Sequence, residues 1–339
     1  MCIRDRNEIP ETLFPETLFP ETLFHSEPWR EAIEQAFELK ILEYVPAAEP
    51  DGAGYYSMLS DVRGERVVCT PFSDFCDPML RTPAGWQEFA DHLRSFERPV
   101  AVRPFHNQLA IADTSFEQRR ELLWHGVDLS QGSEHVWDGL KSKNRTAIRR
   151  ADKLGIKFNF SSSLEHLKTF HDMHVDLRKS KYRMLAQPFS LFEELHGRFG
   201  DDMAVVLATD ADGDPVAGMV FFAWNGVWYY KFSASYPRQY RPNAAMLMAG
   251  IREGADRGLS LMDMGRSDID QPGLVEFKQV FASEELALTT LHWSPEGYND
   301  PAGQEVGKTM GAITELMTDP EVPNHLTAEA GGLLYKYFG

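Results

Sequence analysis

Apolar residues recur through the first half of the chain with the periods of short helices and strands. From Glu27 they return at helical spacing and predict a helix with the apolar face Trp29, Ile33, Phe37 and Leu42. A second helix is expected at 85–96. Short apolar runs bounded by turn residues predict strands at 54–59, 65–70, 99–103 and 121–129. Together these form one alternating α/β unit.

The second half continues the alternation and adds a meander of strands. Asp212-Gly213-Asp214 and Asn225-Gly226 are strong hairpin turns between apolar runs. The pattern predicts strands at 157–160, 203–209, 215–224, 227–233, 259–262 and 286–293. It predicts helices at 163–178, after Pro188 to Phe199, and at 243–257. This order favours a mixed α/β sheet over a regular doubly wound one.

The two ends of the chain differ from this pattern. PETLF occurs three times in succession between Pro10 and Phe24, and a proline in every copy opposes a continuous helix. Residues 1–24 are therefore expected to be a disordered or artefactual tail outside the fold. Residues 296–339 predict two further helices that pack on either half or serve an interface.

The stretch 259–281 combines an apolar strand with candidate chemistry. The strand is expected to end at Asp263, Gly265 and Arg266, followed by a polar loop and a helical turn with Phe277 and Lys278. Loops after strand ends are where α/β proteins usually place functional groups. The stretch predicts either a site for an anionic or amine substrate or a solvated surface loop.

Composition narrows the class of protein. With 43% hydrophobic residues and a formal net charge of −17, the chain is globular, and its charge disfavours DNA binding. The cysteines, Cys2, Cys69 and Cys76, have no metal or disulfide spacing, which favours a cytoplasmic protein. No apolar run is long enough for a membrane helix.

Two local features need separate interpretations. The one strongly basic segment is either a solvated helix face or a contact for phosphate or nucleic acid; its basic residues are Lys141, Lys143, Arg145, Arg149, Arg150, Lys153 and Lys157. His171 and His174 lack a clear third ligand, so no metal site is expected.

Several segments, in this order, resemble the GNAT acyltransferases and, among them, the FemAB-like branch that includes peptidoglycan-bridge and BioF2-like acetyltransferases. They are PFSDFCDPML at 71–80, LKSKNRTAIRRADKLGIKF at 140–158, the run 215–258, LSLMDMGRS at 259–267 and EFKQVFA at 276–282. The resemblance implies two tandem GNAT-like domains at 25–131 and 132–295, the first degenerate, followed by the extension 296–339.

The resemblance also implies an acceptor site. Phe277 and Lys278 match the Phe-Lys of the family's substrate site, where the lysine is associated with binding and acyl transfer. Lys278 is therefore the first candidate catalytic residue. Asp263 and Arg266 follow it as an acidic and a basic residue at the end of the preceding strand. The candidate substrate-binding residues are Phe277, Tyr230, Arg178, Lys181 and Arg183. Tyr230 is alternatively a core residue of an alternating strand.

The donor site is expected where strands 227–233 and 259–262 diverge. The helix from Asn243 would point its N-terminus there, and free N–H groups and the helix dipole bind anions. Arg241, Asn243 and Ala244 are the candidate donor-binding residues. The family's glycine-rich loop is replaced by Pro242-Asn243-Ala244-Ala245, so acetyl-CoA and another acyl donor both stay open. Aminoacyl-tRNA is less favoured, because no long charged heptad arm is present.

The expected function is transfer of an acetyl or aminoacyl group onto an amine or hydroxyl of a cell-wall precursor or polysaccharide sugar. The oxyanion would be stabilised by a strand N–H group or by Lys278. The base would be Asp263, the substrate or water. The alternative is a non-catalytic GNAT fold that binds a glycan or a protein.

Overall fold

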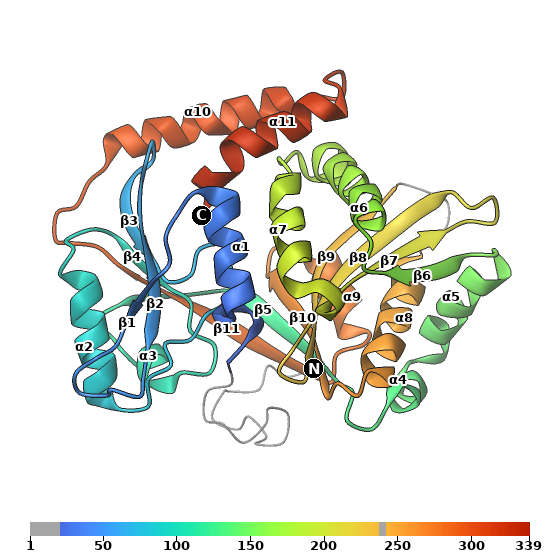
Figure 1. Ribbon diagram of the computed structural model, residues 1–339, viewed down its shortest axis with the longest axis horizontal. Coiled ribbons are helices and arrows are strands. Elements are labelled where there is room, and N and C mark those ends of the chain that lie inside the picture. The colour runs from blue at the N-terminus through green and yellow to red at the C-terminus, as the bar shows by residue number, and fades with distance from the viewer. Residues whose placement is uncertain (1–20, 237–241) are drawn as a thin grey trace.

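A computed structural model describes residues 21–236 and 242–339 of the chain. Within this part, the strands form one mixed sheet in the order β1-β2-β3-β4-β11-β5-β10-β9-β8-β7-β6. Helices cover both faces of the sheet (Figure 1). The mixed α/β fold predicted from the sequence is confirmed.

The first half contains three helices and five strands in the described residues. They are α1 (Glu27–Phe37), β1 (Leu42–Tyr44), β2 (Gly54–Asp61), β3 (Gly64–Val68), α2 (Pro83–Arg94), β4 (Val100–Val102), α3 (Gln108–Ile111) and β5 (Glu117–Asp128). Ser26 and Thr82 begin α1 and α2 as side-chain N-caps, each followed by a proline in the first turn. Leu42 lies in β1 and not on the α1 face, since the helix ends with Glu38 in the left-handed conformation.

The second half is longer and ends in a helical pair. Its elements are α4 (Ser133–Gly139), α5 (Ser142–Lys153), β6 (Lys157–Ser161), α6 (Leu164–Leu177), α7 (Phe189–Phe199), β7 (Met203–Thr209), β8 (Pro215–Trp224), β9 (Val227–Ser235), α8 (Asn243–Asp256), β10 (Leu261–Asp268), α9 (Pro272–Gln279), β11 (Glu284–Trp293), α10 (Pro301–Met317) and α11 (Asn324–Leu334). A π-helical turn, Arg178–Tyr182, extends α6.

One supersecondary pattern occurs in both halves. Strands β7, β8 and β9 are antiparallel, and α8 leads into β10, which is parallel to β9. The first half repeats this with β1, β2 and β3, then α2, and β4 parallel to β3. Its copy has shorter strands and a pairing of only two residues between β3 and β4. This repeat fits the expected pair of GNAT-like halves, the first of them reduced.

The two halves exchange strands at the centre of the sheet. β5, from the first half, pairs with β10, while β11, from the second half, pairs with β4. β5 and β11 also pair with each other. The predicted boundary at residue 131 stays a prediction, and the sheet itself is continuous across it.

The apolar side chains of β7 alternate between two cores. Val205 and Leu207 pack with α1, α6 and α7, whereas Ala204 and Val206 pack with α5 and α8. Burying alternate side chains of a strand on opposite faces requires a helical layer on each side. Strand alternation in the sequence therefore positions α6 and α7 opposite α8.

The predicted tail is wrong for its last residues. Residues 1–20 lie outside the described part, but Leu23 and Phe24 of the third PETLF copy are buried in the core. The Phe24 ring lies 5.1 Å from the ring of Phe75 and 6.1 Å from that of Tyr229. Burial of these apolar side chains in the core is favourable and orders the segment, even though its sequence is repetitive.

The predicted helical extension is present as α10 and α11, which lie across the top of the molecule in Figure 1. Lys179 of the π-helical turn holds this pair, donating to the carbonyl of Val322 and to Asn324 Oδ1 at 3.2 Å. In the described part of the chain, each helix is too short or too polar to cross a bilayer.

Candidate active site

Strands β9 and β10 separate at the centre of the sheet. They pair in parallel over three residues, the last pair being Tyr229 and Asp263, although both strands continue beyond it. The divergence expected from the sequence is therefore present. β10 itself runs to Asp268, whereas the sequence predicted that the strand gives way to a loop after Asp263.

A bulge in each strand marks the divergence. Lys231 is the extra residue of β9, since its neighbours Tyr230 and Phe232 pair with consecutive residues of β8. In β10, Met264 and Gly265 together lie opposite a single residue of β5. Bulges leave backbone groups unpaired and redirect side chains, and they are common beside active sites. Gly265 has φ +66°, a conformation that glycine adopts without strain.

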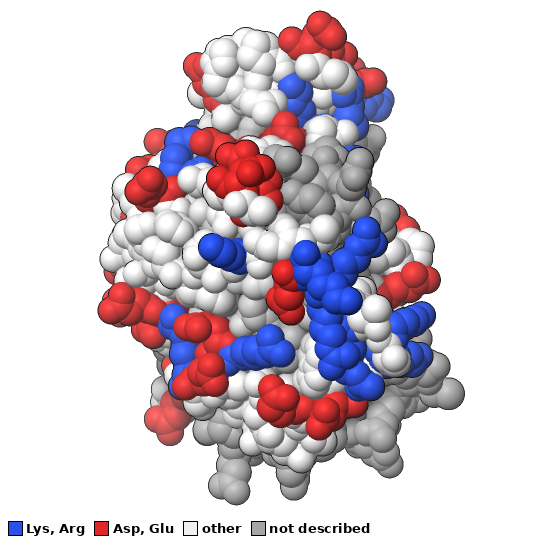
Figure 2. All heavy atoms as spheres, turned by 90° about the vertical axis from the view of Figure 1, so that its right-hand side faces the viewer, with Lys and Arg blue, Asp and Glu red and all other residues white. Residues whose placement is uncertain are grey.

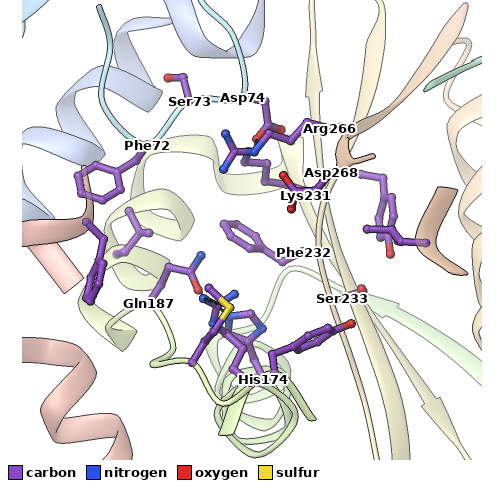
Figure 3. Close-up of a pocket in the computed structure, with 18 of the residues that line it drawn as sticks. Phe72, Ser73, Asp74, His174, Gln187, Lys231, Phe232, Ser233, Arg266 and Asp268 are labelled. Atoms are coloured by element: carbon purple, nitrogen blue, oxygen red, sulfur yellow. Dashed lines mark hydrogen bonds and ion pairs between the residues drawn. The ribbon is translucent and has the colours of Figure 1, made fainter. Parts of the chain in front are cut away.

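The diverging strands line a cavity of about 420 Å³. β9 contributes Tyr230 to Ser233, and β10 contributes Met264, Gly265, Arg266 and Asp268. The other walls come from the loop around Asp74 and from α6, α7, α9 and the C-terminal residues, as the close-up in Figure 3 shows in part. The cavity thus combines segments from both halves and from the extension.

Lys278 lies in the wall of this cavity and is buried. Its Nζ donates to the carbonyl oxygens of Gly265, at 3.0 Å, and Arg266, at 2.8 Å. Burial lowers the pKa of Lys278 to about 8, against the opposing charges of Asp74 and Asp263. The lysine therefore fixes the β10 bulge and brings a proton-bearing cation to the point where the strands part.

Asp263 is buried at the last paired position and is not among the residues lining the cavity. Its Oδ1 accepts the backbone N–H of Gly265 at 2.6 Å. Burial raises the pKa of Asp263 to about 6, although hydrogen bonds from Trp124 and Gly265 lower it. The hydrogen bond to Gly265 supports the β10 bulge. Because Asp263 does not line the cavity, its role as the base stays a prediction.

Arg266 lines the cavity, where it joins an ion-pair cluster that the sequence prediction missed. Asp74 Oδ2 accepts from Lys231 Nζ at 2.8 Å, and Asp74 Oδ1 lies 3.7 Å from Arg266 Nε. Burial opposes ionisation of Asp74, but these cations outweigh it and hold its pKa below the ordinary value. In Figure 3 the three side chains point toward one another.

The sequence offered two weak signals for this cluster. Asp74 belongs to a segment that carried the family resemblance, and Lys231 interrupts an aromatic strand. Only the bulge at Lys231 turns it to the cavity, where Trp29 and Phe24 flank its ammonium group at 5.4 and 4.8 Å.

Tyr230 and Arg178, two of the predicted substrate-binding residues, do line the cavity. Burial raises the pKa of Tyr230 to about 12, so its hydroxyl stays protonated and able to donate. Arg178 Nε donates to the carbonyl of Leu185 at 2.7 Å, and its guanidinium lies 6.0 Å from the ring of Tyr335. Tyr230 is thus both a packed core residue and part of the wall.

Three other predicted substrate contacts lie outside the cavity. Phe277 packs against Phe281 in the core beneath α9, because the helix directs Lys278, and not its neighbour, toward β10. Lys181 is exposed and lies over the Tyr182 ring. Arg183 donates to the carbonyl of Thr318 and ties the π-helical turn to the C-terminal helices. None of the three is among the residues that line the cavity.

The predicted donor residues fall at the start of α8. Arg241 lies outside the described residues. Asn243 and Ala244 are partly buried, do not line the cavity, and begin a helix that packs on the sheet face opposite α6 and α7. The Oδ1 atom of Asn243 is buried and has no hydrogen-bond partner in the described structure. The donor assignment stays a prediction.

The basic segment forms α5, whose cations gather on one face of the molecule (Figure 2). Arg145 donates to carbonyl oxygens at the end of α4, and Arg149 lies 5.1 Å from the Trp137 ring. Both interpretations of this face remain open. Over residues 21–236 and 242–339, no cluster of His, Cys, Asp and Glu is arranged to hold a metal ion.

The arrangement suits addition to a carbonyl group. Diverged strand edges present backbone groups without strand partners, and Lys278 adds positive charge at the same place. Preorganised donors of this kind stabilise the oxyanion of acyl transfer. No nucleophilic side chain is required when the two substrates are held in line.

Comparison with known proteins supports the same chemistry. A family model described as an acetyltransferase (GNAT) domain matches residues 140–279, which include α5, both diverging strands, α8 and Lys278. A comparison with curated proteins gave no match.

Solved structures of similar fold cover most of the chain. The crystal structure of FemX matches with a TM-score of 0.64 and 12% identity, over 85% of this chain and 94% of that one. The C-terminal domain of a putative lysylphosphatidylglycerol synthetase from Agrobacterium fabrum gives a TM-score of 0.56 at 12% identity, over 85% and 93%. L-PGS from Bacillus licheniformis gives 0.55 at 14%, over 87% and 98%.

At these identities the solved structures establish the fold, while the family model identifies the domain that contains the diverging strands. Residues 140–279 are therefore a GNAT acetyltransferase domain, which makes the protein an enzyme of this type, and the chain as a whole has a fold similar to that of FemX.

Proposed function

We propose that this enzyme transfers an acyl group from an acyl-CoA to an amine or hydroxyl of a cell-wall precursor or polysaccharide sugar. The observation that carries the proposal is Lys278, a buried lysine bonded to the bulged edge of β10 in the wall of the cavity. The resemblance of several segments to the FemAB-like branch, which includes peptidoglycan-bridge acetyltransferases, favours an acceptor from the cell envelope. The cavity, lined by polar and aromatic residues, is the proposed acceptor site.

The donor is assigned to the opposite side of the diverging strands. α8 begins there, and the N-terminus of a helix of this length stabilises anions such as a pyrophosphate. The two substrates would then meet at the gap between β9 and β10. An aminoacyl donor remains the second candidate, favoured by the exposed basic face of α5.

The reaction proceeds by addition and elimination. The acceptor nitrogen or oxygen forms a bond to the thioester carbonyl carbon, and the resulting oxyanion is stabilised by Lys278 or by an unpaired N–H group of β9. Collapse breaks the carbon–sulfur bond, and the thiolate leaves with the proton that the acceptor loses. Asp263 does not line the cavity, so water or the acceptor itself is the proposed carrier of that proton.

Two measurements test this proposal. Acetyl-CoA should raise the Tm of the wild type, because a ligand that binds only the native state stabilises it; charged tRNA is the comparison. With an amino sugar or a peptide amine as acceptor, Lys278→Ala should lower kcat by about 10²- to 10³-fold, the usual loss on removing an oxyanion donor, while the Tm rise with the donor is retained.

Lys308→Ala is the matched control, since Lys308 is exposed on α10 and pairs with Glu305 one turn before it. Its turnover should equal that of the wild type. Undiminished turnover by Lys278→Ala would remove Lys278 from the mechanism. If charged tRNA raised the Tm and acetyl-CoA did not, the donor would be aminoacyl-tRNA and the proposed acyl-CoA donor would be wrong.

A further inference from the structure

The cavity carries an excess of positive charge in a strongly acidic protein. Its wall contains five arginine and lysine side chains and two aspartates, in a chain of formal net charge −17. The cations are Arg103, Arg178, Lys231, Arg266 and Lys278, and the acids are Asp74 and Asp268. Positive charge concentrated in a cleft attracts an anionic ligand.

Four of these five cations already have partners. Lys231 and Arg266 share Asp74, and Lys278 donates to two backbone carbonyls. Arg178 donates to the carbonyl of Leu185. Arg103 differs: across residues 21–236 and 242–339, its guanidinium has no hydrogen bond or ion pair, although it lines the same cavity.

Arg103 is placed there by the first half of the chain. It directly follows β4, the strand that pairs with β11, and its backbone carbonyl accepts the N–H of Cys76 at 2.9 Å. This bond links Arg103 to the loop that carries Asp74. The side chain is only partly exposed, and an arginine withdrawn from water without a partner is unfavourable.

The charges around Arg103 favour an anionic ligand. Burial, together with the positive charge of Arg266, lowers the pKa of Arg103 to about 10. Asp74 opposes this shift but is already bound to Lys231. An anion between the two arginines would relieve their repulsion and satisfy the Arg103 donors.

We propose that Arg103, together with Arg266, binds a carboxylate or phosphate monoester group of the ligand in this cavity. The planar guanidinium fork matches both groups bidentately, which a lysine does not. Assigning this anion to the acyl acceptor rests on the proposed function, whereas the anion site itself does not. The acceptor would then be an amine or hydroxyl compound that also carries an acidic group.

Binding of simple anions tests the site without any acyl transfer. The Tm of the wild type is measured against N-acetylalanine as the carboxylate probe and glucose 6-phosphate as the phosphate probe. Glucose and potassium chloride at matched ionic strength are the blanks. At least one probe should raise the Tm above both blanks, and the one that does identifies the anion.

Arg103→Met should weaken the apparent affinity for that probe by about tenfold or more, the effect of losing a charge-assisted pair. Arg103→Lys keeps the charge but lacks the fork and should weaken it less; it also serves if the methionine variant does not fold. Arg98→Met is the control, because Arg98 is half-exposed in the same segment and pairs with Glu65. Its affinity should match the wild type.

The outcomes separate this inference from the proposed function. If neither probe exceeds the blanks, or if Arg103→Met and Arg103→Lys bind as the wild type does, the anion site is wrong even where acyl transfer is observed. If the probes bind through Arg103 and no acidic acceptor is acylated, the anion site stands and the acceptor assignment fails.

Discussion

Asp263 shows how one buried carboxyl group determines a pH response. Its pKa of about 6 lies above the ordinary value of 3.8 because of burial, with the charge of Asp74 contributing and the bonds from Trp124 and Gly265 opposing. Between these values the folded state binds more protons than the unfolded state. The contribution of Asp263 to stability is therefore full below about pH 4 and is lost as the pH rises through 6.

We expect Asp263→Asn to remove this dependence while keeping an oxygen for the Gly265 N–H. The free energy of unfolding of the variant minus that of the wild type should rise by about 2 kcal/mol when the pH is raised from 4 to 8. Urea denaturation of both proteins at the two pH values measures the difference. A difference that stays constant with pH would show that Asp263 is ionised throughout in the folded protein.

At the level of single elements, the site depends on the bulge of β10. Gly265 adopts φ +66°, and a Cβ added there would lie 3.2 Å from Asp74 Oδ2 and 3.7 Å from the carbonyl of Tyr230. The carbonyl of Gly265 is also one of the two that Lys278 binds. The bulge, α9 and the Asp74 loop are therefore positioned together.

Gly265→Ala should destabilise the protein by about 1–2 kcal/mol, the cost of the left-handed conformation for a residue with a Cβ, and should lower kcat through displacement of Lys278. Urea denaturation and steady-state kinetics measure the two effects. Gly273→Ala is the control: it lies in α9, where an added Cβ meets nothing within 4 Å, and it has no positive φ. Equal effects of both substitutions would contradict the role of the bulge.

α9 itself is held by a second set of polar contacts. Gln279 donates to Glu285 at 2.7 Å, and the same carboxylate lies 2.8 Å from His125 Nε2. These contacts join α9 to β11 and to β5 of the first half. The element that carries Lys278 is thus anchored to both exchanged strands.

Across the whole molecule, the segment before α1 joins the two halves. Phe24 contacts Phe75 from the first half and Tyr229 from the second, and its ring lies 4.8 Å from Lys231 Nζ. The residue is 1% exposed, so its removal leaves a cavity in the main core that surrounding side chains fill only in part.

We expect Phe24→Ala to lower the free energy of unfolding by about 3–5 kcal/mol, the range for truncating a buried phenylalanine. Val45→Ala, at an exposed position beyond β1, is the comparison and should change stability little. Denaturant unfolding of both variants gives the two values. A loss below 1 kcal/mol for Phe24→Ala would mean that this segment is not part of the cooperative core.

Much of the fold was predictable from the chain alone, because local patterns fix local elements. Apolar periodicity and turn residues such as Asn225-Gly226 located the meander β7–β9 and the helices α6, α7 and α8. Family-like segments pointed to Lys278 and to a GNAT-type domain. These signals lie within short stretches of sequence, where side-chain alternation and backbone preference act directly.

The tertiary structure alone decided how distant segments combine. The exchange of β5 and β11, the burial of Leu23 and Phe24, and the pairing of Asp74 with Lys231 depend on contacts between residues far apart in the chain. The same holds for Arg183, which binds the carbonyl of Thr318 and does not line the cavity. It holds also for Arg103, whose guanidinium has no partner among the described residues. Sequence periodicity records which face of an element is apolar, but the partner of a charged side chain is set by the packing of the complete sheet and its helices.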